Sequence, residues 1–324
     1  MAPPRFVAVD VGSTHTKTVV STLDGEFTTP VAREPTRADD LESAVVRTIR
    51  ERLEETTDTR LEGIGVATTG LVDRATGTVR EFDTADGRTL RNVPLGDRLR
   101  EAFGVPVVVE NDCTAAALGE WYFGARERED CLVHVTFATG IGAGVVSDGI
   151  PLRGEHGHAA EVGLFPIHAD GDFASCGVTG AWEAYCSGRG IPRFVESRLD
   201  DGRETTLPAD GTLTAREVFE AAAAGDEYAI ESIDLIGRYN AAGIGAVANA
   251  YDPGLITLGG SVALENSGVI LDGIDRYLDE YCYGERPWIT TTPLGAEIEL
   301  YGALASYLHR ERAPETDLTG RVRG

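Results

Sequence analysis

The sequence predicts an α/β protein of two lobes with a central cleft, and three observations support that class. Its 324 residues are more than one ordinary hydrophobic core holds, and they suit two lobes of about 150 residues each. Strand-like and helix-like patterns alternate along the chain. Each half also opens with a strand, a glycine-rich turn and another strand, which indicates a duplicated architecture whose ligands bind in the cleft.

The elements of the first half follow from hydrophobic pattern and turn residues. Apolar alternation on either side of a Gly-Ser-Thr turn predicts two strands within residues 6–27. An acidic start followed by an i, i+3, i+4 apolar stripe predicts a helix within residues 39–57. The remaining segments are a strand within 61–73 that ends at a glycine-containing loop, a short helix over 95–104, a buried strand over 105–112 and a helix over 114–124.

The second half repeats the pattern and sets the expected lobe boundaries. It contains a strand–turn–strand unit over 131–152, two helices within 214–254, a strand and turn over 255–263, and a last helix over 302–312. We place an N-terminal lobe over residues 1–115 and a C-terminal lobe over 116–302. A C-terminal helix of about 303–324 is expected to pack back on the first lobe.

The charge balance argues against one large class of function. The chain carries 53 acidic and 29 basic residues, for a net charge of −24, and the acidic residues are spread along its length. A basic groove for nucleic acid is therefore not expected. An evenly acidic surface fits a salt-rich cytosol, where screening removes the self-repulsion, so we expect a halophilic source; an acidic mesophilic protein is the alternative.

Cysteine usage and hydropathy predict a cytoplasmic protein. The five cysteines are odd in number and scattered, with no CxxC pair, which is typical of reduced thiols. No apolar run reaches the ~18 residues that a membrane span needs. The first ten residues also lack the layout of a signal peptide.

Three glycine-rich turns are candidate phosphate or nucleotide sites, because small residues let backbone N–H groups approach an anion. Each turn follows a predicted strand, and each taken alone could be an ordinary β-turn. Asp10, just before the first turn, could hold Mg²⁺ through water. Lys17, the only lysine among the 29 basic residues, lies just after it. The turn residues are Gly12, Ser13 and Thr14; Thr139, Gly140 and Gly142; and Gly259, Gly260 and Ser261.

The segment VVVENDCTAAALGE carries the candidate catalytic group. A buried strand ends there in Glu110, Asn111 and Asp112, at the position where ligands bind in open α/β sheets. An amide beside a carboxylate suits a hydroxyl-rich substrate: the amide orients one hydroxyl, and the carboxylate takes a proton from another as it attacks phosphorus. The alternative is that Asp112 simply caps the following helix.

Together these segments resemble the ROK family of repressors, uncharacterised reading frames and sugar kinases. DVGSTHTK, GIGVATTGLVDRATGTV, VPVVVEND, FATGIGAGVVSDG and YDPGLITLGGSVA are similar, in order, to the family's motifs, and the likeness runs from residue 6 to about 305. The resemblance implies the actin/hexokinase-like ATPase fold, which is ribonuclease H-like. It also implies a hexose kinase of carbohydrate metabolism that uses ATP and Mg²⁺, a glucokinase by default, acting on the exocyclic 6-hydroxyl. Family members are usually homodimers or homotetramers.

The resemblance also implies roles for individual residues. Asp112 would be the general base, and Asn111, Glu161 and Glu183 would hold the sugar with it. Asp10 would assist Mg²⁺, with Lys17 as a supporting charge. The turns at Gly12–Thr14 and Thr139–Gly142 would cradle phosphates, and Gly259–Ser261 would border the adenosine.

One loop departs from the family pattern. Typical members carry one histidine and three cysteines that bind a structural zinc. In this sequence those positions hold Leu164, Ala174, Cys176 and Ala181, so three of four ligands are missing and no tetrahedral zinc site is expected. We expect His156, His158 and His168 to be solvated, and the loop to be held by packing of Phe165, Phe173 and Trp182.

The missing histidine leaves the substrate open. A sugar hydroxyl facing Leu164 would lose a partner, at a cost of about 1–3 kcal/mol, unless His156, His158 or His168 replaces it. Fructose, mannose or an N-acetylhexosamine is then an alternative to glucose, and polyphosphate an alternative to ATP. A catalytically silent sugar-binding protein is a further alternative. A sugar-responsive transcription factor would need a helix-turn-helix before residue 10, where we see no room for one.

Overall fold

The computed structural model describes residues 3–56, 60–124, 129–199, 203–208 and 210–312, which belong to two compact units. Unit 1 contains Met1–Arg126, Arg153–Ala159 and Glu297–Gly324, and unit 2 contains Glu127–Leu152 and Ala160–Ala296. The boundary expected at residue 115 falls inside helix α3 (Asp112–Phe123), which packs against α10 (Ile298–Arg312) within unit 1. The return of Arg153–Ala159 to unit 1 was not expected from the sequence.

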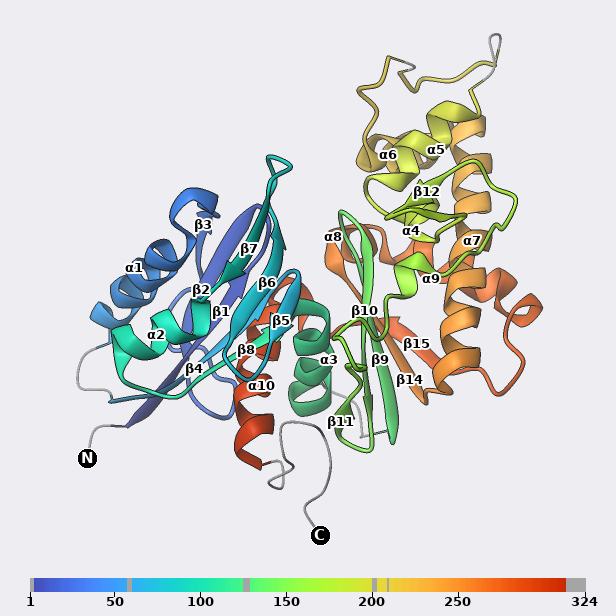
Figure 1. Ribbon diagram of the computed structural model, residues 1–324. Coiled ribbons are helices and arrows are strands. Elements are labelled where there is room, and N and C mark those ends of the chain that lie inside the picture. The colour runs from blue at the N-terminus through green and yellow to red at the C-terminus, as the bar shows by residue number, and fades with distance from the viewer. Residues whose placement is uncertain (1–2, 57–59, 125–128, 200–202, 209, 313–324) are drawn as a thin grey trace. The chain divides into compact units, whose positions relative to one another are not determined.

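Unit 1 is built on a five-stranded sheet in the order β3-β2-β1-β4-β8 (Figure 1). Strands β1, β4 and β8 run parallel, while β2 pairs antiparallel with both β1 and β3. Their bounds are β1 Pro4–Val11, β2 His15–Ser21, β3 Ala32–Pro35, β4 Arg60–Thr68 and β8 Val107–Asn111. The two strands predicted within residues 6–27 are therefore confirmed.

Alternating side chains of β1 serve two cores, one on each face of this sheet. Val7, Val9 and Val11 pack with α1 (Leu41–Glu54) and α2 (Leu95–Phe103). Phe6 and Ala8 pack on the opposite face with residues of α3 and α10. Because both faces are covered, strand β1 reads as a nearly continuous apolar run, and polar groups gather at its carboxyl end.

A second, three-stranded sheet of unit 1 was only partly predicted. It has the order β5-β6-β7, with bounds β5 Leu71–Asp73, β6 Thr78–Asp83 and β7 Thr89–Val93. The strand predicted within residues 61–73 is confirmed as β4, and the glycine-containing loop expected at its end is the turn at Gly70, whose φ is +89°. A Cβ at Gly70 would lie 1.9 Å from the carbonyl oxygen of Glu81, so only glycine fits this close approach.

Unit 2 repeats the same sheet plan, in the order β11-β10-β9-β14-β15 (Figure 1). Strands β9, β14 and β15 are parallel, and β10 pairs antiparallel with β9 and β11. The bounds are β9 Cys131–Phe137, β10 Ile141–Ser147, β11 Ile150–Pro151, β14 Leu255–Gly259 and β15 Trp288–Thr291. The matching order and directions confirm the duplicated α/β architecture.

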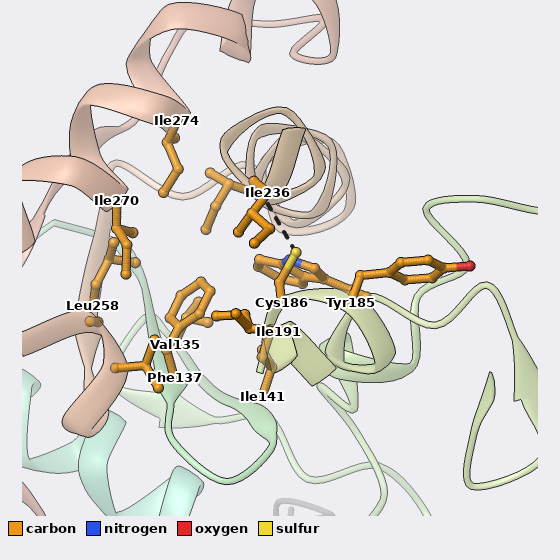
Figure 2. Packing of buried hydrophobic residues seen from close by; sticks show 14 of the residues in the cluster. Val135, Phe137, Ile141, Tyr185, Cys186, Ile191, Ile236, Leu258, Ile270 and Ile274 are labelled. Carbon is orange, nitrogen blue, oxygen red and sulfur yellow. Dashed lines mark hydrogen bonds between the residues drawn. The ribbon is translucent and has the colours of Figure 1, made fainter. Parts of the chain in front are cut away.

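The helices of unit 2 enclose one large apolar core around Trp182. Figure 2 shows part of it, with Phe137 of β9 among residues from β10, β14 and several helices. The fully buried Trp182 ring meets Phe137 edge to face at 5.4 Å, and its Nε1 donates to Asn240 Oδ1 at 2.9 Å. The helices are α4 Glu183–Cys186, α5 Gly190–Ser197, α6 Ala215–Ala223, α7 Glu227–Tyr251, α8 Gly260–Glu265 and α9 Ser267–Tyr277. No helix in the described ranges is both long and apolar enough to cross a membrane.

Candidate active site

In unit 1 the parallel strands β1, β4 and β8 end side by side, and predicted site residues lie at these ends. In the strand register Val11 pairs with Thr68, and Thr68 pairs with Asn111. Asp10 is the last residue but one of β1, and Asp112 follows β8 directly as the first residue of α3. The carboxyl ends of parallel strands form the ligand edge of an open α/β sheet, so this edge is the candidate site of unit 1.

Asp112 is held in place by two nitrogen donors. Its Oδ1 accepts from the backbone N–H of Cys113 at 2.8 Å and from Asn111 Nδ2 at 3.0 Å. Both of these donors are neutral groups. A carboxylate fixed in this way can accept a proton from a substrate hydroxyl.

Asn111, and not Asp112, is the residue that caps α3. Asn111 Oδ1 accepts from the backbone N–H of Thr114 at 3.1 Å, the usual N-cap bond. Its Nδ2 also donates to the carbonyl oxygen of Gly70 at 3.1 Å, besides the bond to Asp112. The amide therefore uses both of its N–H donors and part of its acceptor capacity on the protein. This geometry makes Asn111 a support for Asp112.

Asp10 lies in a buried cluster that holds more negative than positive charge. It sits directly across the β1–β2 pair from Lys17, whose Nζ is 3.3 Å from Asp10 Oδ2 and 3.4 Å from Glu299 Oε2. Burial raises the pKa of Asp10 to about 7; the neighbouring Glu299 and Asp112 add to the rise, and Lys17 opposes it. Burial alone would lower the pKa of Lys17, but attraction to Asp10 and Glu299 outweighs it and raises that pKa. The lysine therefore lies among carboxylates, and the cluster favours an additional cation.

The first glycine turn, between β1 and β2, is tightly closed. The Gly12 N–H donates to the carbonyl oxygen of His15 at 3.0 Å, and the Thr36 hydroxyl donates to the Gly12 carbonyl at 2.7 Å. A Cβ at Gly12 would lie 3.1 Å from the His15 oxygen. The backbone N–H of Thr36 binds the carbonyl of Thr14, and that of Ala85 binds the carbonyl of Ser13. The protein thus satisfies carbonyl groups of the turn and also the Gly12 N–H, so an anion would bind the other N–H groups of the turn.

In unit 2 the second glycine turn is tied to Glu183, the first residue of α4. Glu183 Oε2 accepts from the backbone N–H of Ile141 at 3.0 Å, within the turn between β9 and β10. Its other oxygen, Oε1, accepts from the hydroxyl of Ser175. A Cβ at Gly140 would lie 2.6 Å from Oε2, so the missing side chain lets the carboxylate reach the turn. Sequence reasoning missed Ser175, because nothing in its local pattern distinguishes it from other loop serines.

The remaining predicted residues of unit 2 lie on loops and strand ends. Glu161 is exposed just before a turn of 3₁₀ helix, and Ser261 is exposed at the start of α8. Gly259 ends β14 against His134, where a Cβ would lie 2.7 Å from the imidazole Cε1. His134 is fully buried, and burial lowers its pKa to about 3. Its Nδ1 shares a hydrogen bond of 2.8 Å with the Thr257 hydroxyl, while its Nε2 has no protein partner in the described ranges.

The loop that departs from the family pattern brings together no metal ligands. Among the described residues, no group of three or more histidine, cysteine, aspartate or glutamate side chains could hold a metal ion. His156 and His158 are exposed in the segment that belongs to unit 1. His168 is exposed in unit 2, where its Nδ1 lies 3.4 Å from the Tyr239 hydroxyl. Leu164 packs against the apolar core.

Hydrogen bonds and aromatic packing hold this loop. Backbone bonds join Trp182 N to Phe165 O at 2.9 Å and Gly180 N to Phe173 O at 2.7 Å. Phe165, Phe173 and Trp182 all pack in the core of unit 2, as expected. The sequence did not point to the additional rings, which lie 5.2–6.2 Å apart around Phe173 and come from Tyr185, Phe194 and Tyr239.

The two five-stranded sheets have the same strand order, and each unit begins with a strand, a glycine turn and another strand. This arrangement is the actin/hexokinase-like ATPase fold. The sequence model of the ROK family matches residues 6–305, and the chain belongs to that family. It is 35% identical to a glucokinase of Aeropyrum pernix over 96% of this chain and 99% of that one. Among solved structures it resembles a ROK hexokinase from Thermus thermophilus, with a TM-score of 0.78 and 31% identity over 95% and 100% of the two chains. It also resembles a Streptomyces griseus ROK glucokinase in complex with glucose and AMPPNP, with a TM-score of 0.75 and 30% identity over 95% and 99%.

Proposed function

We propose that Asp112 is the general base of a glucokinase reaction, in which the γ-phosphoryl group of ATP passes to the 6-hydroxyl of glucose. The chain is an ATP-dependent sugar kinase of the glucokinase kind, in keeping with its relatives. The observation that carries the residue assignment is the orientation of Asp112 by Asn111 and the Cys113 N–H at the end of β8. The oriented carboxylate accepts the hydroxyl proton as the sugar oxygen attacks phosphorus.

The other predicted residues act by binding and positioning. Glu161 and Glu183 accept hydrogen bonds from sugar hydroxyls, and Asn111 keeps Asp112 aimed at the reacting one. The turns Gly12–Thr14 and Thr139–Gly142 hold phosphates through backbone N–H groups other than those of Gly12 and Ile141, which already donate to His15 and Glu183. Gly259–Ser261 border the adenosine. Catalysis then consists largely of orientation and of electrostatic stabilisation of the phosphoryl group.

The cluster around Asp10 suits Mg²⁺ bound through water. Asp10 is buried, its pKa is raised to about 7, and Lys17 beside it already contacts two carboxylates. A divalent cation would relieve that excess of negative charge. Mg²⁺, when bound with ATP, neutralises charge on the β- and γ-phosphates. Asp10 would hold its water shell, while Lys17 keeps the Asp10 carboxylate in place.

Release of ADP with each of five sugars tests this function directly. The sugars are glucose, fructose, mannose, N-acetylglucosamine and N-acetylmannosamine, each assayed in low and in molar KCl. We expect turnover on glucose that falls by at least about 10²-fold in Asp112→Asn. Asp24→Asn, the same chemical change at an exposed turn, is the matched control and should retain full activity. Sugar binding without turnover in the folded parent chain would favour a catalytically silent sugar-binding protein instead.

We also propose a setting for this enzyme. The net charge of −24 suits a salt-rich cytosol, and the five free thiols suit a reducing one, so we place the enzyme in the cytoplasm of a halophile. Its expected homodimer or homotetramer can be measured by light scattering in molar KCl. A chain whose helical circular dichroism is the same from 0.1 to 3 M KCl would contradict the proposed salt adaptation.

A further inference from the structure

We propose that Ser175 is a positioning residue that, through Glu183, links the binding of sugar to the binding of nucleotide. This inference rests on the proposed function of the sugar-binding carboxylate and of the turn Thr139–Gly142. It adds a residue to which the family motifs assign no role, and it gives the loop around Ser175 a task in catalysis.

The link begins with the two oxygens of one carboxylate. Glu183 Oε1 accepts from the Ser175 hydroxyl, and Oε2 accepts from the Ile141 N–H at 3.0 Å. With one donor on each oxygen, the carboxylate plane cannot rotate without breaking a bond. A carboxylate still has lone pairs left after two such bonds, and these can accept hydroxyl groups of a sugar.

The second half of the link is the turn itself. Ile141 lies inside the turn between β9 and β10, and a Cβ at Gly140 would be only 2.6 Å from Glu183 Oε2. The turn also closes on itself, with the Ala138 N–H donating to the Gly140 carbonyl at 2.9 Å. A change in the direction of the Glu183 carboxylate therefore changes the position of backbone N–H groups that would bind phosphate. A sugar bound to Glu183 and a nucleotide bound to the turn then favour the same arrangement, so each tightens binding of the other.

Ser175 is presented by a small hairpin with a rigid base. Strands β12 (Ala174–Ser175) and β13 (Val178–Thr179) pair antiparallel, and the turn between them uses the positive φ angles of Cys176 and Gly177. At its base the Gly180 N–H donates to the Phe173 carbonyl, and Phe173 packs at 5.5 Å against Tyr185. The hydroxyl of Ser175 is thus supplied from a fixed hairpin rather than from a free loop.

Titration calorimetry of glucose with and without AMPPNP and Mg²⁺ measures the link. We expect AMPPNP to tighten glucose binding to the parent chain by at least about fivefold. In Ser175→Ala, AMPPNP should change the glucose Kd by less than about twofold. Ser175→Thr, which keeps the hydroxyl on a strand residue, should restore the fivefold effect. Thr179→Ala, which removes an exposed hydroxyl from the same hairpin, is the matched control and should behave like the parent.

The outcomes separate this inference from the proposed function. An unchanged factor in Ser175→Ala, with a melting temperature equal to that of the parent, would overturn the inference and leave the kinase assignment standing. A glucose Kd of the parent chain that is the same with and without AMPPNP would also overturn the inference, since there would be no coupling for Ser175 to transmit. A parent chain that binds none of the five sugars would overturn both proposals together.

Discussion

Asp10 should make the folded protein less stable as the pH rises. Burial and the nearby Glu299 raise its pKa from 3.8 to about 7, with Lys17 opposing the rise. Between these two pH values the folded chain keeps a proton that the unfolded chain has released, so the free energy of unfolding falls with increasing pH. Each pH unit of that interval lowers the free energy of unfolding by ~1.4 kcal/mol. Between pH 4 and pH 8, the free energy of unfolding of the parent chain should therefore fall by about 4 kcal/mol relative to that of Asp10→Asn.

Urea unfolding of both proteins at a fixed molar KCl concentration provides the assay. The difference in unfolding free energy between the two is the quantity of interest, because titration of groups distant from Asp10 cancels from it. Asp10→Asn keeps Lys17 beside Glu299 at 3.4 Å, so the lysine is not left without a carboxylate. A difference that stays constant within about 0.5 kcal/mol from pH 4 to pH 8 would refute the reasoning, since it would mean that Asp10 titrates alike in both states.

Three further perturbations test other parts of the structure. His134, whose pKa burial lowers to about 3, stays neutral when folded, so the parent chain should lose about 2–3 kcal/mol relative to His134→Leu between pH 7 and pH 4.5, by urea unfolding. Asn111→Ala removes both the helix cap and a donor to the catalytic carboxylate, and should lower stability by about 1 kcal/mol and kcat by at least tenfold; Asn111→Ser should restore the stability but not kcat. Gly140→Ala places a Cβ 2.6 Å from Glu183 Oε2 and should weaken glucose binding at least about tenfold in calorimetry, whereas Gly268→Ala, which has open space, should not.

The contrast between Lys17 and Glu299 shows what the sequence can and cannot predict about the site. Lys17 lies across from Asp10 because a short turn joins two strands, and that register follows from local spacing. Glu299 reaches the same lysine from 282 positions away, through the packing of α10 on the sheet. No local pattern carries that information, so the sequence predicted a supporting charge but not the carboxylate cluster that surrounds it.

The missed strands had a different cause. Strands β6 and β7 flank an Asp-Gly turn, and Val79 and Phe82 of β6 are buried, so a hairpin signal was present. It was weak because each strand has few apolar residues. In contrast, Glu110 and Asn111 were correctly placed at the end of a buried strand, because a run of three valines strongly favours a buried strand. Short half-exposed strands are therefore harder to predict than buried ones.

The loop around Glu183 illustrates how a site can keep its geometry under strong ionic screening. The donors that orient Asp112 and Glu183 are backbone N–H groups, an amide and a hydroxyl, none of which carries a charge. The rings of Phe173, Tyr185 and Tyr239 add apolar contacts, which salt does not weaken as it weakens exposed ion pairs. The charged groups of the cluster around Asp10, namely Asp10, Lys17 and Glu299, are largely shielded from solvent. Added salt should therefore change activity mainly through the folding of the acidic chain, with little change in KM once the chain is folded.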